Sequence, residues 1–265
     1  MDPRRASNLL SCPPMTPHPT RLSTKSIPRN ERLIVALDVP THADAKRWAM
    51  RLGDDVRFYK LGLELLMSDG YFALIDDLMK MGKRVLADLK VCDVPETVER
   101  TVHNLHGRPG LFVTFHAIES VIQVACKAKN GLRVLAVTVM TSLDKNDLVD
   151  MGMPDKFDVE DLVLSRARRA LELGADGIIS SGLEIPRLRE HVGDRPLIVS
   201  PGIRPFENRL DPDFRDDQKR VVDVETAFLN GADYIIVGRP ILRKRNPTQA
   251  AKDIQDRIAR LFPDG

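Results

Sequence analysis

The stretch RVLADLKVCD, residues 84–93, is an apolar run of strand length with charged residues at its carboxyl end. A nearly continuous apolar run is typical of a strand in a parallel sheet that is covered on its faces. The two-residue period of a strand turns Asp88 and Lys90 to one face, while Leu89 and Val91 turn to the other. If the sheet closes into a barrel, we therefore expect Asp88 and Lys90 to face its interior.

Runs of the same kind recur on both sides of this stretch, and helix-length amphipathic segments separate them. No GxGxxG motif follows the first run to indicate a dinucleotide-binding sheet. Eight strand–helix units predict an α/β fold, a single-domain (βα)8 TIM barrel over residues 32–265. The predicted strands span residues 33–39, 56–61, 84–91, 111–116, 133–140, 177–180, 197–200 and 234–238.

Helix punctuation between the runs agrees with this alternation. Thr41 followed by Asp44 and Ser120 followed by Gln123 resemble capping boxes. Asp223 has a side-chain oxygen that can cap the helix predicted after it.

Charge and cysteine content exclude several classes of protein. The 40 basic and 38 acidic residues leave a net charge of +2, so no field favours a nucleic-acid or membrane partner. The three cysteines, Cys12, Cys92 and Cys126, lie far apart without CxxC spacing, which argues against disulfides and a zinc site. We therefore expect a cytoplasmic protein without a metal ion.

Residues 1–31 are rich in proline and basic residues and contain no apolar run long enough for a secretory signal. We interpret them as a disordered leader that precedes the barrel.

Polar residues cluster at the carboxyl ends of the predicted strands. In a (βα)8 barrel these ends converge on one mouth, where active sites lie. A structural ion pair would explain Asp88 and Lys90 alone, but several ionisable groups in one cavity are costly unless chemistry needs them. The strand ends carry Asp38, Lys60, Asp88, Lys90, His116, Thr141, Ser142, Gly202, Arg204, Gly238 and Arg239, and Asp93 follows on a loop.

The segments PGIR, residues 201–204, and GRP, residues 238–240, follow the last two predicted strands. These two loops often form a phosphate site in such barrels, since glycine lets backbone N–H groups approach an anion and arginine donates to it. The sequence therefore predicts a phosphorylated substrate.

Several motifs together resemble the orotidine 5′-phosphate decarboxylase family in order over residues 32–245. The DxKxxD segment is shared with sibling phosphosugar enzymes, whereas its combination with the later motifs is more specific. These motifs are ALD (36–38), YKLG (59–62), DLKVCDVPET (88–97), TVMTS (138–142), PGIR (201–204), DQKR (217–220) and DY to GRP (233–240).

The resemblance implies a cofactor-free decarboxylase that converts orotidylate to UMP. It assigns Lys90 as the proton donor to C6 of the pyrimidine and Asp88 as the neighbour of the departing carboxylate. Lys60 and Asp93 complete the charged array, with Asp93 contributed across a homodimer. It further implies that the ribosyl part contacts Asp38 and Thr97, that the pyrimidine meets Thr141 and Ser142, and that phosphate binds Arg204, Gln218, Gly238 and Arg239.

Three alternatives remain open from the residues. A magnesium-dependent phosphosugar decarboxylase or hexulose-phosphate synthase would share DxKxxD but would not need Thr141 and Ser142. A Schiff-base aldolase would need Lys60 or Lys90 with a lowered pKa, which adjacent carboxylates oppose. A barrel that only binds a ligand, without catalysis, would not need the four charged residues Lys60, Asp88, Lys90 and Asp93.

Overall fold

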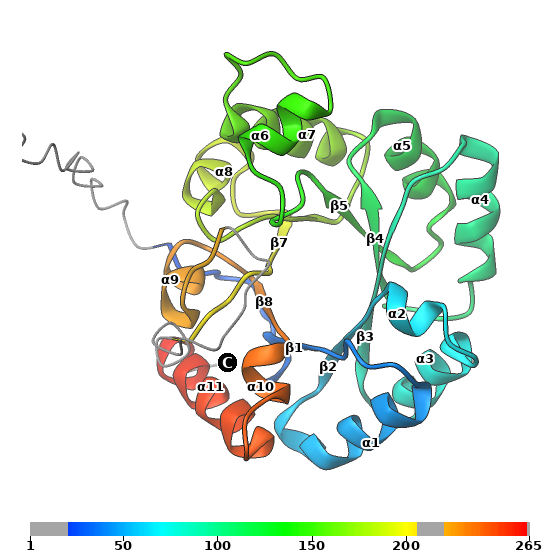
Figure 1. Ribbon diagram of the computed structural model, residues 1–265, viewed down its shortest axis with the longest axis vertical. Coiled ribbons are helices and arrows are strands. Elements are labelled where there is room, and N and C mark those ends of the chain that lie inside the picture. The colour runs from blue at the N-terminus through cyan, green and yellow to red at the C-terminus, as the bar shows by residue number, and fades with distance from the viewer. Residues whose placement is uncertain (1–20, 206–219, 264–265) are drawn as a thin grey trace, which may run out of the picture.

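The computed structural model describes residues 21–205 and 220–263, which form a closed barrel of eight parallel strands in sequential order (Figure 1). The predicted (βα)8 barrel is therefore confirmed. The strands are β1 (Leu33–Ala36), β2 (Phe58–Leu61), β3 (Arg84–Val91), β4 (Phe112–His116), β5 (Arg133–Val137), β6 (Gly177–Ile179), β7 (Leu197–Ser200) and β8 (Tyr234–Val237).

Helices surround the barrel in Figure 1, and each longer one turns an apolar stripe to the sheet. The α-helices are α1 (His42–Leu52), α2 (Leu63–Leu66), α3 (Tyr71–Lys80), α4 (Pro95–Asn104), α5 (Glu119–Ala128), α6 (Lys145–Asp150), α7 (Val159–Glu172), α8 (Ile185–Val192), α9 (Val224–Leu229), α10 (Arg239–Leu242) and α11 (Pro247–Leu261). Two 3-10 turns, η1 (Arg29–Glu31) and η2 (Gly53–Asp55), complete the described elements. None of the helices in the described ranges has the length and apolarity to cross a bilayer.

The predicted helix starts were right at two of three positions. The side chains of Thr41 and Asp223 accept hydrogen bonds from the amides of Asp44 and Thr226 and cap α1 and α9. The capping box predicted at Ser120 is wrong, because α5 begins at Glu119 and places Ser120 within the first turn.

The core consists of two layers that follow the alternation of the strands. Residues that face outward pack under the helices in the larger cluster, whereas those that face inward fill the barrel. Three aromatic rings, those of Phe58, Phe112 and Tyr234, meet edge-to-face inside the barrel with centroids 5.2 to 5.9 Å apart. This packing fills the barrel interior with side chains, as is usual for the fold.

The segment 21–31, predicted as part of a disordered leader, is instead held against the barrel. Ile27 is 8% exposed and belongs to the inner apolar cluster. The fully buried Asp233 accepts hydrogen bonds from Ser23 and Lys25 and from Arg189 of α8. One buried apolar side chain and paired charges thus order a stretch that lacks strand or helix periodicity. Residues 1–20 lie outside the described part, so the leader stays a prediction there.

Two strands end three residues earlier than predicted, and both differences concern the barrel mouth. β1 ends at Ala36 instead of residue 39, and β5 ends at Val137 instead of residue 140. The sequence stays apolar past both ends, since residues such as Leu37 and Val139 are still buried although they lie outside the strands. Asp38 and residues 138–140 therefore lie on connections at the mouth of the barrel.

Candidate active site

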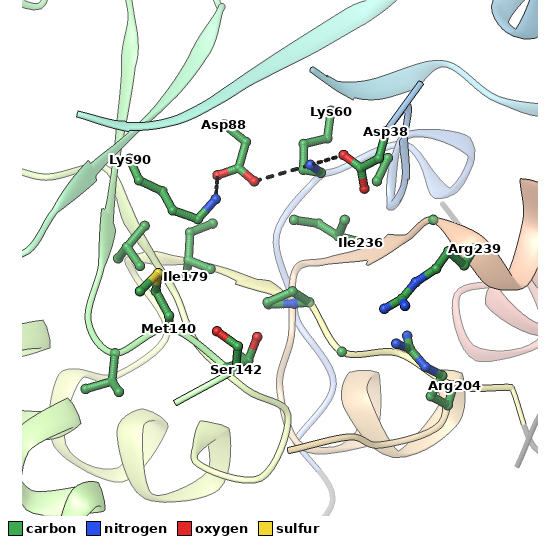
Figure 2. Close-up of a pocket in the computed structure, with 17 residues that line it drawn as sticks. Asp38, Lys60, Asp88, Lys90, Met140, Ser142, Ile179, Arg204, Ile236 and Arg239 are labelled. Carbon is green, nitrogen blue, oxygen red and sulfur yellow. Dashed lines mark hydrogen bonds and ion pairs between the residues drawn. The ribbon is translucent and has the colours of Figure 1, made fainter. Parts of the chain in front are cut away.

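Four charged side chains of alternating sign form a row at the mouth (Figure 2). Lys60 Nζ lies 2.9 Å from Asp38 Oδ1 and 3.4 Å from Asp88 Oδ2. Lys90 Nζ lies 2.9 Å from Asp88 Oδ1, so Asp88 bridges the two lysines. The structure thus brings together residues from the ends of three neighbouring strands, as the sequence predicted for this set.

Lys90 reaches the row through an irregularity in β3. The pairing of β3 with β4 shifts register between Ala87 and Val91, and Lys90 has a positive φ of 48°. A non-glycine residue in this region is uncommon and is a form of backbone strain that clusters at active sites. Both Asp88 and Lys90 line the pocket, but the bulged backbone rather than a regular two-residue period places Lys90 there.

Thr114 holds this bulge and was not predicted as a site residue. Its fully buried hydroxyl donates to Asp88 Oδ1 over 3.0 Å and accepts from the backbone amide of Lys90 over 2.9 Å. One side chain thus orients both the carboxylate and the backbone that carries the ammonium. The available signal was a hydroxyl residue at an inward-facing position of β4, between the two inward positions Phe112 and His116.

The protonation states in the row follow from burial and neighbouring charge. Burial acts to lower the pKa of the Lys60 ammonium, but Asp88 and Asp38 outweigh it and raise the pKa above its ordinary value. Burial likewise acts to raise the pKa of the Asp88 carboxyl, but Lys60, Lys90 and a hydrogen bond from Thr114 lower it. Lys60 is therefore a cation and Asp88 an anion at neutral pH.

The row forms one end of a pocket of about 240 Å³, and two arginines form the other. The guanidinium groups of Arg204 and Arg239 point toward each other in Figure 2, from the connection after β7 and from the first residue of α10. Gly202, two residues before Arg204, has φ 74°, a conformation that disfavours any residue with a side chain. Two converging cations and the adjacent glycines Gly202 and Gly238 suit a dianionic group.

The space between the charged ends has both polar and apolar walls. Thr141 and Ser142 line it from the β5–α6 connection, as predicted from the sequence. Met140, Ile179 and Ile236 add apolar surface beside Lys90 and Lys60 (Figure 2). A flat ring with polar edges fits this combination.

Two predicted site residues do not line this pocket. Asp93 is exposed on the loop after β3, where its carboxylate accepts from the amide of Val94 over 2.7 Å. Thr97 is half-buried on α4 and is likewise absent from the lining. Gln218 lies outside the described residues.

His116 is half-buried, and its burial together with Lys90 and Arg166 lowers the pKa of its imidazole. It does not line the pocket. Within residues 21–205 and 220–263, no three histidine, cysteine or acidic side chains are grouped so that they could hold a metal ion.

Fold and site define the chain as a (βα)8-barrel enzyme with an acid–base cluster at the carboxyl ends of its strands. The sequence profile of the Orotidine 5′-phosphate decarboxylase / HUMPS family matches residues 31–254, and the chain belongs to that family.

Individual relatives agree with this assignment. The chain is 52% identical over 247 residues to an orotidine 5′-phosphate decarboxylase of Methylococcus capsulatus, covering 93% of this chain and all of that protein. It is 46% identical to the Stenotrophomonas maltophilia protein of the same name, covering 87% and 93%. The crystal structure of orotidine 5′-phosphate decarboxylase from Lactobacillus acidophilus superposes with a TM-score of 0.73 at 31% identity, covering 86% and 99%.

Proposed function

We propose that this chain is an orotidine 5′-phosphate decarboxylase, which converts orotidylate to UMP and CO2 without a cofactor. The observation that carries the proposal is the position of Lys90 Nζ, 2.9 Å from Asp88 and at the opposite end of the pocket from two arginines. Phosphate would bind between Arg204 and Arg239, which orients the pyrimidine toward the charged row. Thr141 and Ser142 would meet the edge of the base.

The charged row suits a reaction in which negative charge develops on carbon. When the bond between C6 and the carboxyl group breaks, CO2 leaves and its bonding electron pair remains on C6. The Lys90 ammonium stabilises that pair and then transfers a proton to C6, which yields UMP and a neutral amine that solvent reprotonates. Asp88 would lie against the substrate carboxylate and disfavour the bound ground state relative to the transition state.

The residues also argue against the sibling chemistries. A metal ion would have to compete with two ammonium groups, because Asp38 Oδ1 and both oxygens of Asp88 lie against Lys60 and Lys90. A Schiff-base nucleophile would need a neutral amine, whereas the raised pKa of Lys60 keeps that group charged.

The test is ultraviolet monitoring of orotidylate with the purified chain. We expect orotidylate to be consumed in the presence of excess EDTA at the same rate as in its absence. Loss of activity on chelation would favour the magnesium-dependent sibling, and substrate trapped by borohydride would favour the aldolase. Absence of turnover under both conditions would contradict the proposal.

We further propose that the enzyme is a cytoplasmic homodimer in which Asp93 of the partner subunit completes each site. Asp93 does not line the pocket of its own chain, and exposed apolar side chains follow the carboxyl ends of β2, β3 and β4. These are Leu63, Met67, Val94 and Ile118, with 49%, 81%, 63% and 46% exposure. Exposed large apolar residues around a charged group are typical of an interaction surface.

Complementation tests this arrangement. Lys90→Met and Asp93→Asn should each inactivate a homodimer, but a heterodimer keeps one site with native Lys90 and native Asp93. Random association of equal amounts should therefore restore about one quarter of wild-type sites. Activity that stays at the level of the separate variants, although subunits exchange, would show that Asp93 serves its own chain.

A further inference from the structure

Arg220 is a nearly buried cation outside the pocket that connects three structural elements. Its guanidinium is ion-paired with Glu184, at the start of α8. It also donates to the backbone carbonyls of Val139 over 3.3 Å and Met140 over 3.0 Å, on the connection after β5. Only 14% of the Arg220 side chain and 6% of the Glu184 side chain are exposed. Replacing either Arg220 or Glu184 would leave the other as a buried charge without a counter-ion, which destabilises a fold.

The Glu184 carboxylate is itself fixed in place. Its second oxygen accepts from Ser180 Oγ over 3.0 Å, and its pKa is raised by burial against the opposing effect of Arg220. The Arg220 Nε is buried and has no hydrogen-bond partner among the described residues. Burying this ion pair, and burying Nε without a hydrogen bond, costs free energy that a surface pair would avoid. We therefore expect the precise position of the guanidinium to have a role in this protein.

Arg220 is also tied to the phosphate end of the pocket. Two residues later, Val222 pairs in parallel with Ile203, the neighbour of Arg204. The amide of Arg204 donates to Val222 O over 2.8 Å, and the amide of Val222 donates to Gly202 O over 3.3 Å. The segment that carries Arg220 is thus hydrogen-bonded on both sides of Ile203, through Gly202 and through Arg204 itself.

The close packing at this junction allows little adjustment. A Cβ atom on Gly182 would lie 2.3 Å from Val222 Cγ2, so the chain after β6 lies directly against the segment that carries Arg220. A displacement on one side of the junction is therefore transmitted to the other, because packed interiors are stiff.

We infer that Arg220 is a positioning residue that couples the phosphate-binding Arg204 to the base-facing residues Thr141 and Ser142. The carbonyls it holds, those of Val139 and Met140, immediately precede Thr141. The backbone pairing of residues 202–204 with residue 222 supplies the other half of the connection. This inference rests on the proposed function, since the two ends of the pocket matter together only if one substrate spans them.

A double-mutant cycle on kcat/KM for orotidylate tests the coupling. Arg220→Met keeps the length of the side chain but removes every donor, and we expect it to lower kcat/KM about 10- to 100-fold by misplacing the loop. In an Arg204→Met background the same change should cost at least about fivefold less, because the phosphate end is already lost.

Arg166 provides a matched control. It donates to Thr138 O over 2.8 Å from α7 and so supports the same loop, but no hydrogen bond or ion pair among the described residues links it to residues 202–204. Arg166→Met should therefore cost the same factor whether or not Arg204 is present. If Arg220→Met lowered kcat/KM by the same factor with native Arg204 and with Arg204→Met, the inferred coupling would be wrong, and Arg220 would only support the loop locally.

Arg220→Lys keeps the test decisive if Arg220→Met does not fold. An ammonium retains the charge beside Glu184 but cannot span the carboxylate and both carbonyls, so an intermediate loss in kcat/KM is expected with native thermal stability. Full activity of Arg220→Lys would also overturn the inference. Failure of the proposed function is a separate result, because wild-type protein would then not consume orotidylate.

Discussion

Replacing Lys90 with Met is expected to lower kcat for orotidylate about 10⁴-fold or more, since both charge stabilisation and proton transfer are lost. Lys90 lines the pocket, its side chain is 31% exposed, and within the described row it pairs with one carboxylate, that of Asp88. Lys60 is bound between two carboxylates and cannot take over its position. Single-turnover and steady-state rates, followed by ultraviolet absorbance, would measure the loss.

Lys129→Met is the matched control. Lys129 is also a partly exposed lysine, 29% by side chain, and pairs with Asp176 over 2.9 Å outside the active-site pocket. It should keep wild-type kcat, and both variants should keep the thermal transition of a folded barrel. Residual activity of Lys90→Met within about tenfold of wild type would exceed what a lost general acid allows and would reassign the proton donor.

The barrel was predictable because its determinants are local and repeated. Apolar runs of strand length recur eight times, and one wrong helix cap, that at Ser120, does not change the number of units. The strand ends were less predictable, since apolar residues beyond β1 and β5 pack in loops as they would in strands. The ordered segment 21–31 could not be predicted, because its stability comes from Asp233, Arg189 and the barrel floor, which are distant in sequence.

In the site, the ionisable residues at strand ends were predictable because fold topology gathers them at one mouth. Asp38, Lys60, Asp88 and Lys90 indeed lie in one row. The supporting roles of Thr114 and Arg220 were not predictable, because no sequence motif indicates what the hydroxyl or the guanidinium contacts. Their roles depend on a bulge in β3 and on backbone carbonyls, and both are properties of tertiary structure.

Asp88→Asn should lower kcat/KM about 10³-fold and also destabilise the fold by about 3–5 kcal/mol at neutral pH, because it leaves a buried cation with one partner fewer. Only 13% of the Asp88 side chain and 11% of the Lys60 side chain are exposed. Asn keeps the shape and can still accept from Thr114, so the loss reflects charge rather than packing. Urea unfolding of both proteins at pH 7 would measure this loss of stability.

Asp77→Asn is the comparison for a surface pair. Asp77 lies 2.8 Å from Lys46, but both side chains are over one third exposed, and its removal should change stability little. If Asp88→Asn were no more destabilising than Asp77→Asn, the row would not be an interdependent buried cluster.

The pH dependence of the Asp88→Asn effect separates charge from structure. The pKa of Asp88 is lowered in the folded protein, so its contribution is present above the unfolded value of about 3.9 and is lost as pH falls through the folded value. The pKa of Lys60 is raised, so its contribution is present below about 10.4 and is lost as pH rises through its folded value. The difference in free energy of unfolding between wild type and Asp88→Asn should therefore be constant between about pH 3.9 and about pH 10.4 and become smaller in acid. A difference that persists unchanged under acid conditions where Asp88 is protonated would mean that Asn disturbs packing, and the electrostatic account of the row would fail.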